Sequence, residues 1–128
     1  MSNFHFLKNE WFSLYQNMLK AEQRVKKEPV STAIYCRVVL EECVYEIYEI
    51  HHLDWPYNQD LANLMSQEEF KAIVPNEHRR GLYIVRKTGN NAAHYGRKVG
   101  SKDALISIKQ LFGFLKWFAN EYSGILPD

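Results

Sequence analysis

The chain has 128 residues, a length that fits one domain with a single hydrophobic core. Hydrophobic residues make up 46% of it and aromatic residues 14%, which excludes a disordered tail, because such tails lack the apolar surface that offsets chain entropy. With 16 basic and 15 acidic residues, the chain lacks the overall charge of a polyanion-binding protein.

Two long helices are expected in the first half of the chain. After Asn3, a good N-cap, apolar residues recur every three or four positions to about Lys27, where basic residues suit the carbonyl end of a helix. A second helix is expected from about Ser31 to His52, because the same apolar spacing continues for longer than a typical strand. Beside its apolar stripe, Arg37 and Glu41 form an i,i+4 pair.

Short elements are expected to follow. Pro56 disfavours helix at the residue before it, which predicts a loop around Asp54–Asn58. Asp60 can cap a short helix, and the sequence Ser66-Gln67-Glu68-Glu69 is a capping box that leads into another.

Two further helices complete the pattern. One is expected over about Asn76–Lys87, with Gly89 as its stop, and the last begins after Gly100 with Ser101 as its N-cap. The predicted fold is therefore all-α, an up-and-down helical bundle of about five helices that forms one domain over residues 1–124. The residues expected in its core include Trp11, Leu40, Ile47 and Phe112.

Cysteine usage and hydropathy indicate a cytoplasmic protein. Cys36 and Cys43 lie seven positions apart on one predicted helix, about 10 Å along its axis, which is beyond disulfide reach. We expect both to be reduced and to face the core, as is usual in the cytosol. The chain has no secretory signal pattern and no apolar run of 18 residues, so we expect no membrane partner.

The motifs of common catalytic sites are missing from the sequence. His51 and His52 are adjacent on a predicted helix and therefore point about 100° apart, so they cannot chelate one metal together. No H-x-x-x-H or C-x-x-C spacing occurs, and neither does a glycine-rich phosphate loop or a G-x-S-x-G nucleophile motif. We expect no metal site and no cofactor within this chain.

The segment R-K-T-G-N-N-A-A-H-Y-G, residues 86–96, is the strongest candidate site. It is expected to form a turn between helices, with two amides and a histidine surrounded by basic residues. Histidine beside arginine is the minimum for RNA cleavage, because one moves a proton and the other stabilises the charge on phosphorus. The same asparagines could instead serve turn geometry, with the histidine joining two helices. The binding candidates are Asn90, Asn91, His94, Arg97 and Lys98, and the catalytic candidates are His94 and Arg86.

Charge is concentrated around this segment. Between Asn76 and Lys102 the only acid is Glu77, whereas seven residues are basic: Arg79, Arg80, Arg86, Lys87, Arg97, Lys98 and Lys102. Such a surface can steer toward phosphate or an acidic protein, although a solvated helix face has the same composition.

The pattern R-x-x-G-N-x-A-A-H-x-G, after a helix that bears Arg37 and Leu40-Glu41 and before an amphipathic one, resembles the HEPN-like helical domain. It resembles most the version at the N-terminus of type I restriction endonuclease R subunits, and the likeness runs from Phe4 to Tyr122. The resemblance implies that residues 125–128 begin a linker to nuclease and motor domains. It also implies a parent that is an ATP-dependent DNA translocase and endonuclease, using ATP and Mg²⁺, with the other subunits of a restriction-modification complex as partners. DNA and a second copy of the chain are further candidate partners.

The resemblance also bears on catalysis. HEPN ribonucleases use an arginine, a polar residue, about three spacers and a histidine. Here His94 takes the histidine position and Asn90 the polar one, but Gly89 stands where the arginine is expected. The resemblance therefore implies a non-catalytic interaction domain. A stand-alone HEPN ribonuclease of toxin type and a small nucleic-acid-binding module are the alternatives.

Overall fold

The computed structural model describes residues 2–94 and 99–125, and in these ranges it is all-helical, as predicted. It has six α-helices and one short 3₁₀ helix, η1, rather than about five helices. Their bounds are η1 His5–Leu7, α1 Phe12–Arg24, α2 Pro29–Ile50, α3 Leu61–Ser66, α4 Glu68–Ile73, α5 Asn76–Ala93 and α6 Ser101–Tyr122.

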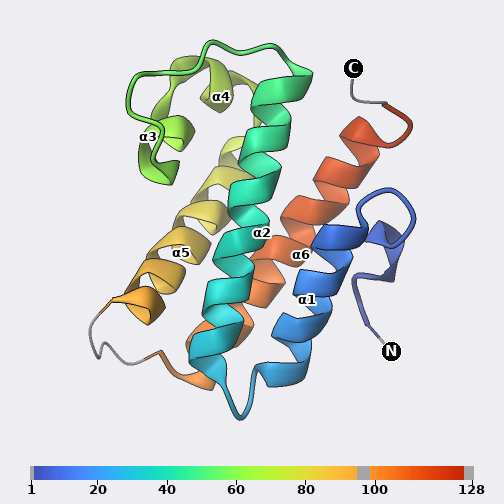
Figure 1. Cartoon of the computed structure of the whole chain (residues 1–128), viewed down its shortest axis with the longest axis vertical. Helices are drawn as coiled ribbons and strands as arrows, with labels where there is room; N and C mark the ends of the chain where they lie inside the picture. The colour runs from blue at the N-terminus through green and yellow to red at the C-terminus, as the bar shows by residue number, and fades with distance from the viewer. Residues whose placement is uncertain (1, 95–98, 126–128) are drawn as a thin grey trace.

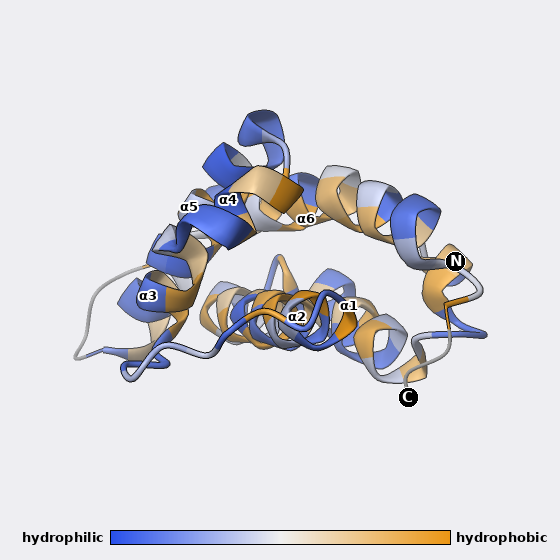
Figure 2. Cartoon of the chain, turned by 90° about the horizontal axis from the view of Figure 1, so that it is seen from above, coloured by the Kyte–Doolittle hydropathy of each residue, from blue (hydrophilic) through white to orange (hydrophobic). Residues whose placement is uncertain are grey.

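The four long helices form an up-and-down bundle (Figure 1). Helix α2 packs against α1, α5 and α6, and α5 packs against α6. Seen from above, α1 and α2 form one layer and α6 lies across from them in the other (Figure 2). The short helices α3 and α4 lie at one end of the bundle, in the connection between α2 and α5 (Figure 1).

The bundle core is built around α2, whose inward face places nine residues out of solvent. Leu40 and Ile47 are fully buried, as predicted. Trp11, which was also expected in the core, is only half-buried, with its ring against that of Phe118 at the edge of the bundle. The prediction for Phe112 is wrong, because 38% of it is exposed. The buried stripe of α6 runs through Leu111, Phe114 and Leu115, which turns Phe112 toward the outside of the bundle.

The first helix does not begin at Asn3 as expected. Residues His5–Leu7 form η1 instead, and α1 starts only at Phe12. The reason is a tertiary contact: Phe4 is fully buried and packs its ring against that of Phe112 on α6, with ring centroids 5.7 Å apart. The break lets the chain cover α6 before α1 turns toward α2.

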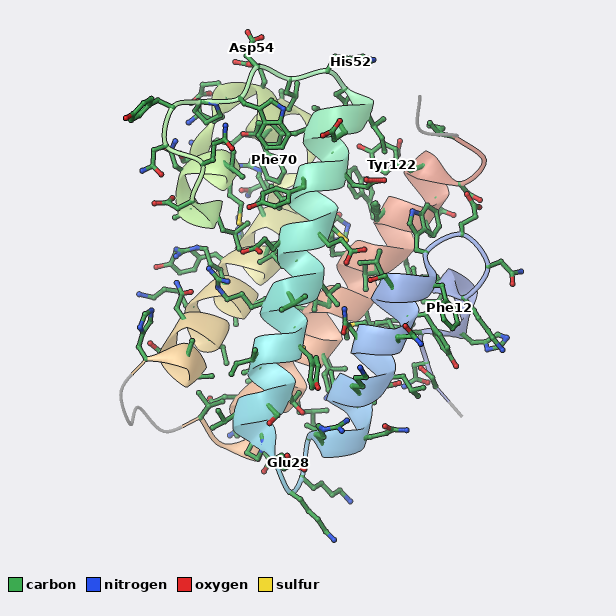
Figure 3. All side chains as sticks on the ribbon, viewed as in Figure 1. Phe12, Glu28, His52, Asp54, Phe70 and Tyr122 are labelled. Carbon is green, nitrogen blue, oxygen red and sulfur yellow. The ribbon has the colours of Figure 1, made fainter. Side chains whose placement is uncertain are left out.

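Aromatic packing closes the end of the bundle near α3 and α4. The ring of Tyr48 on α2 stacks on that of Trp55 in the connecting loop, with ring centroids 4.8 Å apart, and on that of Phe70 of α4, with centroids 6.1 Å apart. Phe70 projects from α4 toward α2 (Figure 3). As expected, Asp60 caps α3, since its carboxylate accepts the Asn63 backbone N–H at 2.9 Å.

Both cysteines are buried free thiols, as the sequence indicated. Burial raises the pKa of Cys36 to about 12 and that of Cys43 well above its ordinary value, so neither thiol has the character of a nucleophile. Among the described residues, none of the helices is long and apolar enough to cross a membrane.

We expect Leu40→Ala to lower the free energy of unfolding by about 2–5 kcal/mol, because it leaves a cavity at the centre of the bundle. Urea unfolding followed by circular dichroism measures the loss. The same substitution at Leu105, which is 41% exposed on α6, is the control and should cost less than half as much. A loss below about 0.5 kcal/mol for Leu40→Ala would contradict the central position of α2.

Candidate functional site

The candidate segment is largely helical, which corrects the prediction of a turn. Helix α5 does not stop at Gly89 but continues through both asparagines to Ala93. Gly89 is buried, and its role is to allow contact between helices rather than to end one. A Cβ at this position would lie 2.6 Å from the Cβ of Arg37 on α2, so only glycine lets the two helices approach this closely.

A polar network crosses between α2 and α5 at this contact. The Nε of Arg37 donates a hydrogen bond to Oδ1 of Asn90 at 2.8 Å. One turn along α2, Oε2 of Glu41 accepts a hydrogen bond from Nη1 of Arg37 at 3.2 Å, which makes the i,i+4 ion pair predicted from the sequence. All three side chains are half-buried. The guanidinium of Arg37 thus bonds both the amide of Asn90 on α5 and the carboxylate of Glu41 on its own helix, α2.

The histidine follows directly after the helix. His94 is exposed and has extended backbone, and its N–H donates to the carbonyl of Asn90 at 3.1 Å. Asn91 is half-buried in the last turn of α5. The other two predicted binding residues, Arg97 and Lys98, lie outside the described residues.

Arg86 is not brought to the end of α5. It precedes Ala93, the last residue of α5, by seven helical steps, which corresponds to about 10 Å along the helix axis. Its guanidinium carbon lies 5.2 Å from the ring centroid of Tyr83, a cation–π contact. The residue that the structure brings beside Asn90 is Arg37, which the sequence identified only as half of an ion pair. A buried glycine inside a helical pattern is the one signal that could have indicated this contact.

A second feature of α5 is its outer face. Arg80, Tyr83, Ile84 and Lys87 are all exposed and recur at i, i+3, i+4 and i+7, so they line one side of the helix. We call them the α5 stripe. Tyr83 is 52% exposed and Ile84 38%, and Nζ of Lys87 lies 5.9 Å from the Tyr83 ring centroid. Arginine and tyrosine are among the side chains that protein interfaces favour.

The histidines elsewhere do not assemble a metal centre. Across residues 2–94 and 99–125, no three histidine, cysteine or acidic side chains lie close enough to hold a metal ion. The Nε2 atom of His51 shares a hydrogen bond of 2.8 Å with the hydroxyl of Tyr122, which points from α6 toward α2 (Figure 3). His51 therefore joins two helices.

Comparisons of the chain with protein-family models, with curated proteins and with solved structures find no match.

We expect Gly89→Ala to destabilise the protein by about 1–3 kcal/mol, since the new methyl group overlaps the Cβ of Arg37 and the helices must separate. This outcome opposes helix propensity, which favours alanine over glycine by about 1 kcal/mol. Gly113→Ala in α6 is a matched control, because nothing lies within 4 Å of its new Cβ, and it should stabilise the protein by roughly 0.5–1 kcal/mol. Stabilisation by both substitutions in urea unfolding would contradict the close contact.

Proposed function

We propose that this domain is a non-catalytic interaction module, the accessory domain at the N-terminus of a type I restriction-modification R subunit. The resemblance over residues 4–122 implies that the parent protein is an ATP-dependent DNA translocase and endonuclease. The task of the domain is docking, against the other subunits or against the DNA-bound complex. A reading frame that ends at Asp128 would contradict this parentage.

The observation that carries the proposal is the α5 stripe. An exposed tyrosine and isoleucine lie on one helix face between Arg80 and Lys87, with Arg86 against the same tyrosine ring. Single exposed apolar side chains are common on protein surfaces, but two adjacent ones flanked by cations form the kind of patch that an interface uses, with the apolar groups as anchors and the cations for orientation.

The engagement of Asn90 gives a second line of support. Its amide oxygen accepts from Arg37, and the following backbone fixes the direction in which the chain leaves α5. The most specific residues of the motif therefore have a mechanical use, which is to join α2 to α5. A domain kept for contacts needs such a junction even where the chemistry is lost.

The full-length R subunit with its modification subunits on DNA is the system for testing this proposal. We expect the double variant Arg80→Glu, Lys87→Glu to lower the affinity of the R subunit for that complex at least tenfold, because both cations that flank the apolar anchors become anions. Tyr83→Ala should weaken it by about tenfold, as is typical of a central aromatic anchor. Lys26→Glu with Lys27→Glu changes the same charge on exposed residues beside the α1–α2 connection and should leave the affinity unchanged. Equal affinity of all four proteins in titrations by surface plasmon resonance would contradict docking through α5.

A ribonuclease is the second candidate function, and one observation favours it. Arg37 brings a guanidinium to Asn90, four positions before His94, and so provides a cation near the place where Gly89 lacks one. However, Nε of Arg37 already donates to Asn90, and its charge is balanced by Glu41. A transition-state donor must be directed at the oxygen on which charge develops, and the loss of one donor typically costs about a hundredfold or more in rate.

We therefore expect the purified protein not to cleave RNA, structured or unstructured. The assay compares the unaltered chain with His94→Ala, Arg37→Ala and Arg86→Ala, and circular dichroism verifies that each variant is folded. If the unaltered chain cleaves RNA and the cleavage disappears in His94→Ala and Arg37→Ala, the domain is a ribonuclease and the docking function is contradicted. Loss in Arg86→Ala instead would assign the cation to that residue.

A further inference from the structure

The outer side of α2 carries a row of exposed apolar side chains. Helix α2 packs on α5 and α6 with one side, and its other side faces away from that layer (Figure 2). Four large apolar residues of the helix are each 38–41% exposed, at positions that recur after four or seven residues: Val30, Ile34, Val38 and Tyr45. This spacing places them on one line along the helix, about 22 Å from the first to the last. We call these four residues the α2 row.

Helix stability does not account for the α2 row. Valine and isoleucine lose side-chain freedom in a helix and favour it less than straight-chain residues do. The core does not require them either, because nine other residues of α2 are already buried on the inward face. The ring of Trp55, which is 40% exposed, stands edge-on to Tyr45 with ring centroids 5.8 Å apart and extends the apolar surface. A continuous exposed apolar surface of this kind is typical of a contact with another protein.

One end of the α2 row is acidic. Positions 39–60 contain six acids and no lysine or arginine. Four of these acids lie on α2, at positions 41, 42, 46 and 49. The first two are engaged within the chain, by Arg37 and by the hydroxyl of Ser13, which donates to Glu42 at 3.1 Å. Among the described residues, Glu46 and Glu49 form no ion pair.

The other end of the α2 row is basic. Four cations lie on the last turns of α1 and in the α1–α2 connection: Lys20, Arg24, Lys26 and Lys27. The charged groups of the first two lie 5.8 and 5.6 Å from the ring centroid of Tyr35 on α2. Two acids accompany the cations, Glu28 and Glu22, and Glu22 accepts hydrogen bonds from the N-terminal segment. The two ends of the row therefore carry charges of opposite sign.

We propose that the α2 row packs against the α2 row of a second copy of the chain, antiparallel, about a twofold axis that passes beside Val38. In such a contact a residue that precedes Val38 lies opposite the residue that follows it by the same number of positions in the other copy. Val38 then meets its own copy, and Val30 lies close to Tyr45. The acidic end of each copy comes opposite the basic end of the other, with Glu49 facing Lys27, and the symmetry makes this contact twice.

The charges also agree across the width of the helix. An antiparallel twofold contact brings the α1 side of one copy beside the α1 side of the other. The hydrogen bond from Ser13 places Glu42 on the α1 side, and Glu46 and Glu49 follow it at i+4 and i+7 on the same face. The cations beside Tyr35 belong to α1 itself.

The charge pattern also selects the orientation and the occupant. A parallel pair would set each acidic end against its own copy, and such a juxtaposition of like charges is unfavourable. The surface is therefore complementary to itself in the antiparallel orientation, which identifies a second copy of the chain as its occupant.

Other partners match only part of this surface. A basic helix would pair with the glutamates but would meet like charges at the end that carries the four cations, and nucleic acid would be repelled by the acidic end. A contact one helix wide belongs to the small interfaces of weak complexes, so we expect a dissociation constant in the micromolar range. The residues of the contact lie outside the α5 stripe, and the inference does not rest on the proposed function.

The test measures self-association of the chain by sedimentation equilibrium across the micromolar range. We expect a monomer–dimer equilibrium whose Kd rises at least tenfold for Val38→Glu and for Val38→Lys, because each new charge meets its own copy at the axis. An equimolar mixture of the two variants should dimerise again, since glutamate then faces lysine. Ile106→Glu is the matched control, because it changes an isoleucine that is 36% exposed on α6, and it should dimerise like the unaltered chain. Circular dichroism verifies that every variant is folded.

Cross-linking tests the orientation. The native thiols of Cys36 and Cys43 are buried, so a short bismaleimide reacts with introduced cysteines only. We expect it to join the Val30→Cys variant to the Tyr45→Cys variant in a mixture of the two, and neither variant to itself. Cross-linking of the Val30→Cys variant to itself would overturn the antiparallel pair.

A chain that stays monomeric at every concentration would overturn the proposal, as would a dimer that the Val38 variants leave unchanged. Loss of the dimer in both variants without recovery in their mixture would also overturn it, because the axis would then lie elsewhere. Binding of a lysine-rich helical peptide by a monomeric chain, lost in Glu46→Lys with Glu49→Lys, would assign the α2 row to a basic partner instead.

Discussion

The contact between α2 and α5 at Gly89 depends on the absence of a side chain, and most of the structure around the candidate site follows from it. Because Gly89 has no side chain, the aliphatic stem of Arg37 lies directly against α5, with its Cβ, Cγ and Cδ 2.6, 3.1 and 3.0 Å from the place that a Cβ of residue 89 would take. The guanidinium then reaches the amide of Asn90 one position further on. That hydrogen bond fixes the last turn of α5, and with it the place where His94 leaves the helix. Packing density at one glycine therefore sets the geometry of a polar network.

This arrangement explains why the same residues suit both a catalytic and a mechanical interpretation. An asparagine and a histidine four positions apart lie near each other at a helix end, with a cation beside them, whether or not they do chemistry. What distinguishes the two uses is where the donors point. The Nε of Arg37 points at a protein amide and its charge is shared with Glu41, which is how a structural cation is satisfied. The catalytic chemistry open to the segment is therefore limited, because Arg37, the cation bonded to Asn90, also pairs with Glu41.

Sequence periodicity predicted the all-helical fold, the burial of Leu40 and Ile47, and the cap at Asp60, because these depend on neighbours close in the chain. It was wrong at Asn3, Gly89 and Phe112, and each of these errors has a tertiary cause, since the N-terminal segment covers α6, α2 requires a glycine in the middle of α5, and Phe112 contacts Phe4 from a distant part of the chain. The capping box expected at Ser66-Gln67-Glu68-Glu69 does not form either, because Ser66 ends α3 and its hydroxyl donates to the carbonyl of Asn63 there. The candidate residues Asn90 and His94 could be identified from the motif. The partnership of Asn90 with Arg37 could not, because 53 positions separate the two.

The net charge of +1 hides an uneven distribution of charge along the helices. Four glutamates, at positions 41, 42, 46 and 49, follow Arg37 on α2, whereas the outer sides of α5 and α6 carry lysine and arginine. Helix α1, which lies in the same layer as α2 (Figure 2), carries Lys20 and Arg24, so the acidic surface belongs to α2 alone and not to the whole layer. The field near a face depends on the charges of that face even when the net charge is near zero. The outer sides of α5 and α6 therefore attract negatively charged groups more strongly than the end of α2 that carries the glutamates, which gives a nearly neutral domain a local electrostatic preference.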